Sequence, residues 1–357
     1  MPTLPEFRAA IIHAAPLFLD LQASVQKACS LIAESSRNGA SLIAFPETFL
    51  PAFPVWSALR APIHNHELFC RLAGNSMRVP GPELDRICET VRRSGVVVSL
   101  GFNESTESSV GCIFNSNVLI GEDGSILNHH RKMVPTFYEK LTWAAGDGAG
   151  LRVCDTPCGR IGMLICGENT NPLARYTMIA QGEQVHISSY PPVWPTHDPA
   201  VRSNYDLAAA IRLRAGAHSF EAKAFNVVAS GFMDTAIFEL LSQLDSDAAR
   251  VLEGSPRSVS LVTGPSGQAV SEEFCDEEGI LYANIDVSAC IEPKQIHDVS
   301  GGYNRFDVFA LTVNRSSRRP AVFVDSDAVR PADPPPAADD EPATDDFEAT
   351  PDSLHRG

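Results

Sequence analysis

The stretch RIGMLICGENTNPLARY, residues 160–176, combines a short apolar run, a cysteine and the start of a helix. Residues 160–165 predict a buried strand, because five of the six are apolar or glycine. Asn171 offers a side-chain oxygen as an N-cap, and Pro172 suits the first helical position, where no N–H is needed. Cys166 is therefore expected between a strand end and a helix start.

A thiol at this position would face unpaired backbone N–H groups and the positive end of a helix dipole. Both favour the thiolate, which is the nucleophilic form of cysteine. The pattern therefore predicts that Cys166 is a nucleophile. The alternative is a small buried hydrophobic residue without a chemical role, as most free cysteines are. The choice depends on whether other segments supply the groups that such a nucleophile needs.

A cysteine nucleophile needs a base and a group that stabilises developing negative charge. The segment SLIAFPETFLPAFP, residues 41–54, supplies a first candidate. Residues 42–45 predict a buried strand that ends at Pro46, and Glu47 follows directly. This places a carboxylate at the edge of the predicted sheet rather than on a polar helix face.

The segment HHRKMVPTFYEKLTW, residues 129–143, supplies two more candidates. Lys132 follows a strand predicted over residues 125–130, and Glu139 comes seven residues later. Alone, each is typical of solvated surface. Together with the thiol and the first carboxylate they predict one site at the strand ends.

Four motifs resemble, in order, those of the nitrilase or carbon–nitrogen hydrolase superfamily, and more specifically its nitrilase branch. The resemblance runs from about residue 7 to about residue 325. The motifs are FPETFLPAFPVW (45–56), HRKMVPTFYEKLTWAAGDG (130–148), CGENTNPLARYTMIAQGEQVHISSYPP (166–192) and GGYNRFDVFALTVN (301–314).

The resemblance implies that the family's Glu–Lys–Cys triad corresponds to Glu47, Lys132 and Cys166, with Glu139 as a fourth polar residue. It also implies a four-layer αββα sandwich and a homo-oligomer, either a dimer or a larger spiral assembly. The implied reaction converts an organic nitrile to a carboxylic acid and ammonia through a cysteine thioimidate and thioester. It requires no cofactor and no metal.

The chain departs from the family pattern at two positions. Gly167 stands where the nitrilase branch usually has Trp, and this predicts additional space beside the thiol. Gly302 stands where the closing segment usually has His. Glu168 is retained, and we expect it to order the turn rather than take part in chemistry.

Aromatic residues near the three segments are candidates for an apolar substrate pocket, although most aromatic residues are simply core. We expect Trp56, Tyr138 and Trp194 to line such a pocket together with Gly167. Phe53, Trp143 and Tyr190 are left open. An aliphatic or aryl-aliphatic nitrile would suit this pocket better than a highly polar one.

Composition agrees with a soluble enzyme that has a large core. With 357 residues and 44% hydrophobic content, the chain can bury a substantial core, expected as one domain over residues 1–330. Residues 331–357 contain eight Asp or Glu against one Arg and are rich in Pro, which predicts a disordered tail. The body is mildly acidic without a basic stripe, which disfavours nucleic-acid binding.

No window approaches ~18 consecutive apolar residues, and no charged-then-apolar signal pattern opens the chain. We therefore expect neither a membrane span nor secretion. Nine cysteines at irregular spacings predict reduced thiols in the cytoplasm. Cys154 and Cys158 are the only close pair, and without a second pair or a His cluster they do not predict a metal site.

Strand and helix signals alternate along the body, with hairpins mixed in, which predicts a layered α/β fold. Strands are expected at residues 7–13, 42–45, 96–101, 113–120, 125–130, 160–165, 184–189 and 226–230, and around Ser260 and Leu281. Helices are expected at residues 21–37, 82–93, 172–181 and 205–222. GPSG, residues 264–267, is a hairpin-turn signal.

Two alternatives to a nitrilase remain, and a third is disfavoured. An amidase or carbamoyl-amide hydrolase would share the fold, but the loop PTFYEKLTW, residues 135–143, resembles the nitrilase branch. A catalytically idle binding protein would require the loss of a triad residue. A metal-dependent nitrile hydratase would require a tight cysteine cluster. The ratio of acid to amide product is left open.

Overall fold

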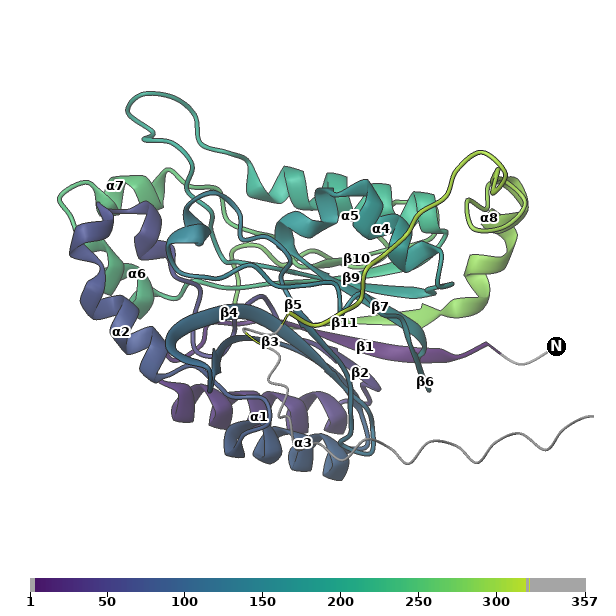
Figure 1. Cartoon of the computed structure of the whole chain (residues 1–357), viewed down its shortest axis with the longest axis horizontal. Coiled ribbons are helices and arrows are strands. Elements are labelled where there is room, and N and C mark those ends of the chain that lie inside the picture. The colour runs from purple at the N-terminus through teal and green to yellow at the C-terminus, as the bar shows by residue number, and fades with distance from the viewer. Residues whose placement is uncertain (1–3, 319–320, 322–357) are drawn as a thin grey trace, which may run out of the picture. The chain divides into compact units, whose positions relative to one another are not determined.

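The computed structural model describes residues 4–318 and 321 (Figure 1). Within these residues, eleven strands form two sheets. The first has the order β11 (Gly279–Asp286), β1 (Glu6–His13), β2 (Leu42–Ala44), β3 (Val97–Thr106), β4 (Ser109–Ile120) and β5 (Ile126–Arg131). The second has the order β10 (Leu261–Thr263), β9 (Phe225–Ser230), β8 (Val185–Tyr190), β7 (Gly159–Ile165) and β6 (Cys154–Thr156).

Helices cover the outer face of each sheet, which confirms the predicted αββα sandwich (Figure 1). Helices α1 (Leu21–Arg37) and α3 (Pro82–Ser94) lie on the six-stranded sheet, and α4 (Pro172–Ile179) and α5 (Leu207–Ala222) lie on the five-stranded sheet. The remaining α-helices are α2 (His66–Gly74), α6 (Thr235–Ser242), α7 (Ala248–Glu253) and α8 (Ile291–Ile296). Short 3₁₀ helices are η1 (Val55–Ala58), η2 (Pro62–His64), η3 (Phe137–Leu141), η4 (Cys166–Thr170) and η5 (Val287–Cys290).

Strand β1 is buried on both faces, and its alternate residues enter different cores. Ala9 and Ile11 pack between the two sheets, whereas Ala10 and Ile12 pack under α1 and α3. This division follows from the two-residue period of a strand. A sheet sandwiched on both sides needs the nearly continuous apolar runs that the sequence shows.

The local signals around Cys166 act as predicted. The Asn171 side chain accepts a hydrogen bond of 2.9 Å from the Leu173 N–H, and Pro172 is the first residue of α4. The GPSG turn also forms, with the Gly264 N–H donating to the Gln268 carbonyl at 2.9 Å. Helices α2, α6, α7 and α8 and the short strand β6 were not predicted.

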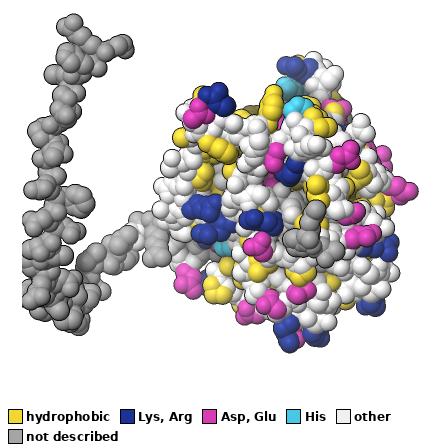
Figure 2. Space-filling view, turned by 90° about the vertical axis from the view of Figure 1, so that its right-hand side faces the viewer, with side chains coloured by type: hydrophobic (Ala, Val, Ile, Leu, Met, Phe, Trp, Pro, Cys, Tyr) yellow, Lys and Arg dark blue, Asp and Glu magenta, His cyan; other side chains and the backbone are white. Residues whose placement is uncertain are grey.

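Three further expectations concern a membrane span, the surface charge and the C-terminal residues. No helix in the described part of the chain is long and apolar enough to span a bilayer. Basic and acidic side chains are interspersed on the face shown in Figure 2. The predicted domain boundary at residue 330 and the tail over residues 331–357 lie outside the described residues.

Candidate active site

Three segments bring their polar side chains together at the carboxyl ends of strands. Glu47 follows β2, Lys132 follows β5, and Cys166 follows β7. One carboxylate oxygen each of Glu47 and Glu139 and the Cys166 sulfur all lie within 4.8 Å of one another. All four side chains are buried. The structure therefore brings together the four residues that the sequence predicted as one site.

The Lys132 ammonium lies between two carboxylates. Its Nζ donates to Glu47 Oε1 at 2.8 Å and to Glu139 Oε2 at 2.6 Å. Its backbone N–H donates to the Asn115 carbonyl at 2.8 Å, which extends the β4–β5 ladder to the site. Although burial lowers the pKa of Lys132, the acidic groups facing it raise that pKa well above its ordinary value. A permanent positive charge is thus held in a water-poor site.

Glu47 is held by a tight backbone approach and one amide. Thr48, the next residue, has φ +46°, and a Cβ on Gly101 of β3 would lie 2.3 Å from the Pro46 carbonyl oxygen. The Asn115 side chain donates to Glu47 Oε1 at 2.6 Å. Glu47 Oε2 has no hydrogen-bond partner among the described residues.

The pKa of Glu47 is raised to about 7, mainly by burial, with Lys132 opposing the rise and the Glu139 carboxylate adding to it. A carboxyl group with this pKa is readily populated in both protonation states near neutral pH. It can therefore accept a proton and return it, as a general base must.

Glu139 lies in the first turn of η3, and its carboxylate folds back onto the start of that turn. Oε2 accepts the Thr136 N–H at 2.7 Å in addition to the Lys132 ammonium. An acceptor at a helix N-terminus satisfies a donor that has no intrahelical partner. The helical turn therefore fixes the carboxylate that holds the ammonium.

Cys166 begins η4 with a φ of +50°, a conformation that a non-glycine residue adopts at some cost. Burial, and then the Glu47 carboxylate, raise the pKa of the Cys166 thiol well above its ordinary value, and Lys132 opposes the shift. The expectation that the helix dipole would favour a resting thiolate is therefore wrong. Burial and the neighbouring carboxylates dominate, so the thiol must lose its proton to a base as it reacts.

Glu168 connects the cysteine turn with the lysine segment. Its carboxylate accepts hydrogen bonds from the Ile165 N–H at 2.9 Å and the Met133 N–H at 2.7 Å, and it pairs with His130 Nε2 at 2.8 Å. Burial raises its pKa, but His130 and the two N–H groups prevail and lower it. These contacts agree with the expectation that Glu168 orders the turn.

The predicted pocket residues occupy different environments. The Tyr138 and Trp194 rings stack with centroids 5.7 Å apart, and Trp194 also packs against the apolar cluster that contains Cys166. Tyr138 Oη and Trp194 Nε1 are buried without a partner among the described residues. Trp56 is a core residue, and its ring packs edge-on against Phe18 with the ring centroids 5.8 Å apart.

The space expected beside Gly167 is filled. A Cβ on Gly167 would lie 2.7 Å from Thr136 Oγ1, so the Thr136 side chain occupies the place where an aromatic side chain would begin. The prediction that glycine opens the site is therefore wrong at this point. Gly302, the other departure, borders open space, since no described atom lies within 4 Å of the position that a Cβ there would take.

A narrow, largely apolar cavity adjoins Glu47. Phe53, which the sequence left open, is among its lining residues, and Trp56 is not. The lining includes Phe18, Phe49, Val55, Met233 and Ile237.

Two polar residues near the site were missed. Asn115 holds Glu47, and its signal was a pair of amides, Asn115 and Asn117, which are both buried in strand β4. Arg214 of α5 donates to Thr170 Oγ1 at 2.6 Å, and its charge helps to lower the pKa of Cys166. No local pattern marks Arg214, because it lies 48 residues after Cys166 in an ordinary helix.

Among the residues that the structure describes, two groups of side chains have the composition of a metal site. In the first, Glu47, Glu139 and Cys166, the Lys132 ammonium already provides the positive charge between the carboxylates. A metal there would have to displace a buried lysine, which the donor set does not favour. The second group consists of Glu183, His186 and His218.

The model of the carbon-nitrogen hydrolase family matches residues 8–295 of the chain. The chain belongs to the carbon-nitrogen hydrolase family. It is therefore a hydrolase that acts on carbon–nitrogen bonds, and the family resemblance of its sequence motifs is confirmed.

Relatives of this carbon-nitrogen hydrolase include several nitrilases. It is 34% identical to a nitrilase of Penicillium rubens over 328 residues, which cover 91% of this chain and 98% of the relative. It is 33% identical to an arylacetonitrilase of Hypocrea virens, with 86% and 92% covered. It is 32% identical to an aliphatic nitrilase of Rhodococcus rhodochrous, with 88% and 84% covered.

Solved structures show the same fold at lower identity. Saccharomyces cerevisiae Nit3, a member of branch 10 of the nitrilase superfamily, matches with a TM-score of 0.62 at 17% identity, covering 83% of this chain and 95% of that one. An amidase from Nesterenkonia sp. matches with a TM-score of 0.57 at 16% identity, covering 82% and 95%.

Proposed function

We propose that this carbon-nitrogen hydrolase is a nitrilase, which converts an organic nitrile and two water molecules to a carboxylic acid and ammonia. Cys166 is the proposed nucleophile, Glu47 the general base, and Lys132 the electrostatic stabiliser held by Glu139. The observation that carries the proposal is the buried Lys132 ammonium between the two carboxylates, beside the Cys166 thiol. The nitrilase and arylacetonitrilase names of relatives that match most of the chain support the same reaction.

In the first step, the free oxygen of Glu47 takes the thiol proton as the Cys166 sulfur attacks the nitrile carbon. The raised thiol pKa makes this transfer necessary, and the Glu47 pKa of about 7 makes it feasible. The C≡N bond becomes C=N, and its nitrogen takes up the proton that Glu47 received, which restores the Glu47 carboxylate for the next step. The product is a thioimidate on Cys166.

In the second step, Glu47 activates a water molecule that adds to the thioimidate carbon. Lys132 stabilises the resulting tetrahedral species electrostatically. Loss of ammonia leaves a thioester, and a second water, activated by the same base, releases the acid and restores the thiol. If the tetrahedral species expels the cysteine sulfur instead, the product is an amide.

The substrate class follows from the aromatic surroundings. Tyr138 stacks on Trp194, and Trp194 packs against the apolar cluster that contains Cys166. Flat, mostly apolar walls suit an aliphatic or aryl-aliphatic nitrile. Trp56, at 1% exposure, would act on this pocket only through the core.

The test is ammonia release and product identity on matched aliphatic, aryl-aliphatic and aromatic nitriles and their corresponding amides. Acid formed from nitriles, with little attack on amides, is the expected result. Turnover of amides alone would replace the proposal with an amidase, since the same thiol, base and ammonium could also cleave an amide. The Cys166→Ala variant, assayed in parallel, reports any ammonia from another source.

We also propose a cytoplasmic homo-oligomer, at least a dimer. Exposed apolar side chains on α4, on α5 and in the segment after α8 support self-association. Among them are Leu173, Leu213, Phe220, Phe306 and Phe309. All nine cysteines are free, which fits a reducing compartment. Sedimentation velocity would test the assembly, and a monomer at micromolar concentration would contradict it.

A further inference from the structure

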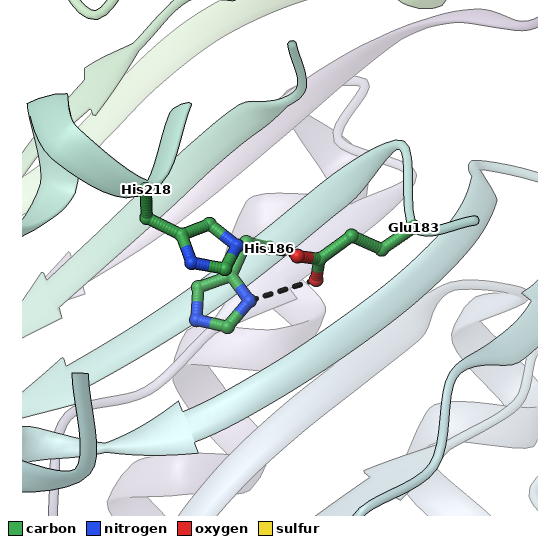
Figure 3. A group of neighbouring side chains, drawn as sticks. All are labelled: Glu183, His186 and His218. Atoms are coloured by element: carbon green, nitrogen blue, oxygen red, sulfur yellow. Dashed lines mark hydrogen bonds and ion pairs between the residues drawn. The ribbon is translucent and has the colours of Figure 1, made fainter. Parts of the chain in front are cut away.

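A second buried cluster of ionisable side chains lies outside the groups assigned to chemistry (Figure 3). Glu183 precedes β8, His186 lies on β8, and His218 lies on α5, all with 0% side-chain exposure. Glu183 Oε2 pairs with His186 Nδ1 at 2.8 Å, and Glu183 Oε1 accepts from His218 Nε2. The two rings lie with centroids 3.9 Å apart.

The five-stranded sheet has a glycine that makes room for this carboxylate. A Cβ on Gly162 of β7 would lie 2.3 Å from Glu183 Oε2. Gly162 pairs with His186 in the parallel β7–β8 ladder, so the glycine, the carboxylate and the imidazole are mutually adjacent. Gly162 also lies only four residues before Cys166, which directly follows the same strand.

The other nitrogen of His186 leads to the cysteine turn. His186 Nε2 lies 3.0 Å from Asn169 Oδ1, and Ser188 Oγ donates to the same oxygen at 3.1 Å. Asn169 Nδ2 donates to the carbonyls of Leu164 and Cys166, at 3.2 and 3.1 Å. The Asn169 amide therefore grips the backbone on both sides of the turn that presents the thiol.

These contacts determine the orientation of the amide and of the protons. Two backbone carbonyls can only accept, so the nitrogen of Asn169 must face them and its oxygen must face His186. His186 Nε2 must then carry a hydrogen. Its Nδ1 faces the Glu183 carboxylate, so a second proton lies between these two residues, and the pair as a whole is neutral.

The pKa shifts show competing influences on this proton. Burial raises the pKa of Glu183, but His218 and His186 prevail and lower it to about 2. Burial and His218 lower the pKa of His186, and Glu183 opposes them. The Asn169 oxygen, like Glu183, favours the protonated form of His186. A deprotonated Nε2 would face this amide oxygen at 3.0 Å without a hydrogen between them.

The backbone of Asn169 is restrained independently. Arg175 donates to the Asn169 carbonyl at 3.1 Å, and a salt bridge of 2.9 Å to Glu221 holds Arg175. With its backbone fixed, the orientation of the Asn169 side chain depends on His186 and Ser188. The turn itself needs such support, because Cys166 has a φ of +50°.

We propose that Glu183, His186 and Asn169 form a positioning relay that holds the Cys166 carbonyl in its strained turn and so aims the thiol at Glu47 and Lys132. None of the three touches the reacting atoms. The inference rests on the proposed function of Cys166 as a nucleophile. It assigns a role in the reaction to a histidine that sequence motifs place only in a strand.

Two substitutions of His186 separate the contacts. In His186→Gln the amide nitrogen can take the place of Nε2 and donate to Asn169, while the contact with Glu183 is lost. In His186→Asn the amide nitrogen can take the place of Nδ1 and donate to Glu183, but the side chain is too short to reach Asn169. The matched control, His218→Gln, perturbs the same buried cluster without changing the contact between His186 and Asn169.

Each variant is assayed on a nitrile for KM and for kcat, with kcat expressed per Cys166 thiol. The rate at which iodoacetamide alkylates Cys166 is measured separately, by mass spectrometry of the peptide that contains it. We expect His186→Asn to lose roughly 10²-fold in kcat with little change in KM, as a small misplacement of a reacting group does. Its alkylation rate should change as well. His186→Gln and His218→Gln should retain most of both rates even where the melting temperature falls.

Equal kcat losses in His186→Gln and His186→Asn, or unchanged kcat in both, would overturn the relay. If His186→Asn does not fold, Asn169→Asp takes its place, because it removes the amide donor to the Leu164 and Cys166 carbonyls, and the relay predicts a lower alkylation rate in the folded protein. An unchanged rate there would equally contradict it. If the wild type hydrolyses no nitrile, the proposed function fails, yet the alkylation rates still decide on the relay.

Discussion

Lys132 Nζ lies 2.6 Å from Glu139 Oε2 in a fully buried hydrogen bond, and the same carboxylate oxygen accepts the Thr136 N–H. The ammonium is thereby anchored to a helical turn as well as to Glu47. Two carboxylates and one ammonium would leave a surplus negative charge, and the pKa of about 7 for Glu47 relieves it by allowing one carboxyl group to be protonated.

Glu139→Gln should lower kcat and move the acidic limb of the pH–rate profile to lower pH. Glu139 adds to the rise in the Glu47 pKa, so its neutralisation lets Glu47 ionise more easily. The loss in kcat should be on the order of 10²-fold, the lower end for a group that supports proton transfer. A full pH profile of the variant checks both effects, and an acidic limb that stays in place would contradict the coupling between the two carboxylates.

The wild-type profile should itself show the base. Glu47 acts in its deprotonated form, so kcat/KM should fall as the pH drops through about 7, the raised pKa of this carboxyl group. The rate should be full above that value and lost progressively below it. Measurement of kcat/KM across this range, with Glu47→Gln as the inactive reference, tests the assignment; a limb near the ordinary carboxyl pKa would count against it.

Cys166→Ala should abolish turnover and leave the fold intact, because alanine removes the proposed nucleophile from a buried position without introducing bulk. Cys158→Ala is the matched control, as Cys158 is also buried but lies at the β6–β7 turn away from the site. Ammonia release and circular dichroism of both variants are the measurements. Undiminished release by Cys166→Ala would remove it as the nucleophile.

Gly167→Ala should lower kcat, because its Cβ would lie 2.7 Å from Thr136 Oγ1 and displace the residue whose N–H binds Glu139. Overpacking of this kind costs about 1–3 kcal/mol. A second change, Thr136→Ala, removes the clashing oxygen and should restore part of the rate, whereas Thr136→Ser keeps it and should not.

The stability of the fold at low pH should depend on a carboxylate away from the site. Burial raises the pKa of Glu104, but Arg131, His129 and Ser116 prevail and lower it to about 2 from an ordinary 4.5. A lowered acid pKa contributes stability above 4.5 that is lost as the pH falls toward 2, here about 3 kcal/mol. Urea unfolding of Glu104→Gln and wild type should show a stability difference that shrinks across this interval.

Alternating strand and helix signals predicted a layered α/β fold, and the family resemblance implied the αββα order. The strand ends near Glu47, Lys132 and Cys166, with Glu139 seven residues after Lys132, predicted that these four side chains meet. Strand β3 extends to Thr106, beyond the predicted end at residue 101. Its last residues include polar ones whose partners lie far along the chain: Asn103 donates to the Ala52 carbonyl, and Glu104 accepts from Arg131. The pattern of apolar residues along the chain does not indicate such distant partners.

The two wrong expectations concern quantities set by three-dimensional surroundings. The ionisation of Cys166 depends on burial by segments distant in sequence, which a helix-dipole argument omits. The space beside Gly167 depends on Thr136, which a different strand and loop deliver. The buried Glu183 and His186 look like ordinary strand-flanking residues until β7, β8 and α5 are placed together.

Glu168 ties the end of β7 in one sheet to the residue after Lys132, which follows β5 in the other sheet. During refolding, neither sheet alone could assemble the proposed base, ammonium and nucleophile, since they come from both. Catalytic activity should therefore return only when the two sheets dock face to face, after secondary structure has formed. The rate at which turnover recovers during refolding would therefore report the rate at which the two sheets dock.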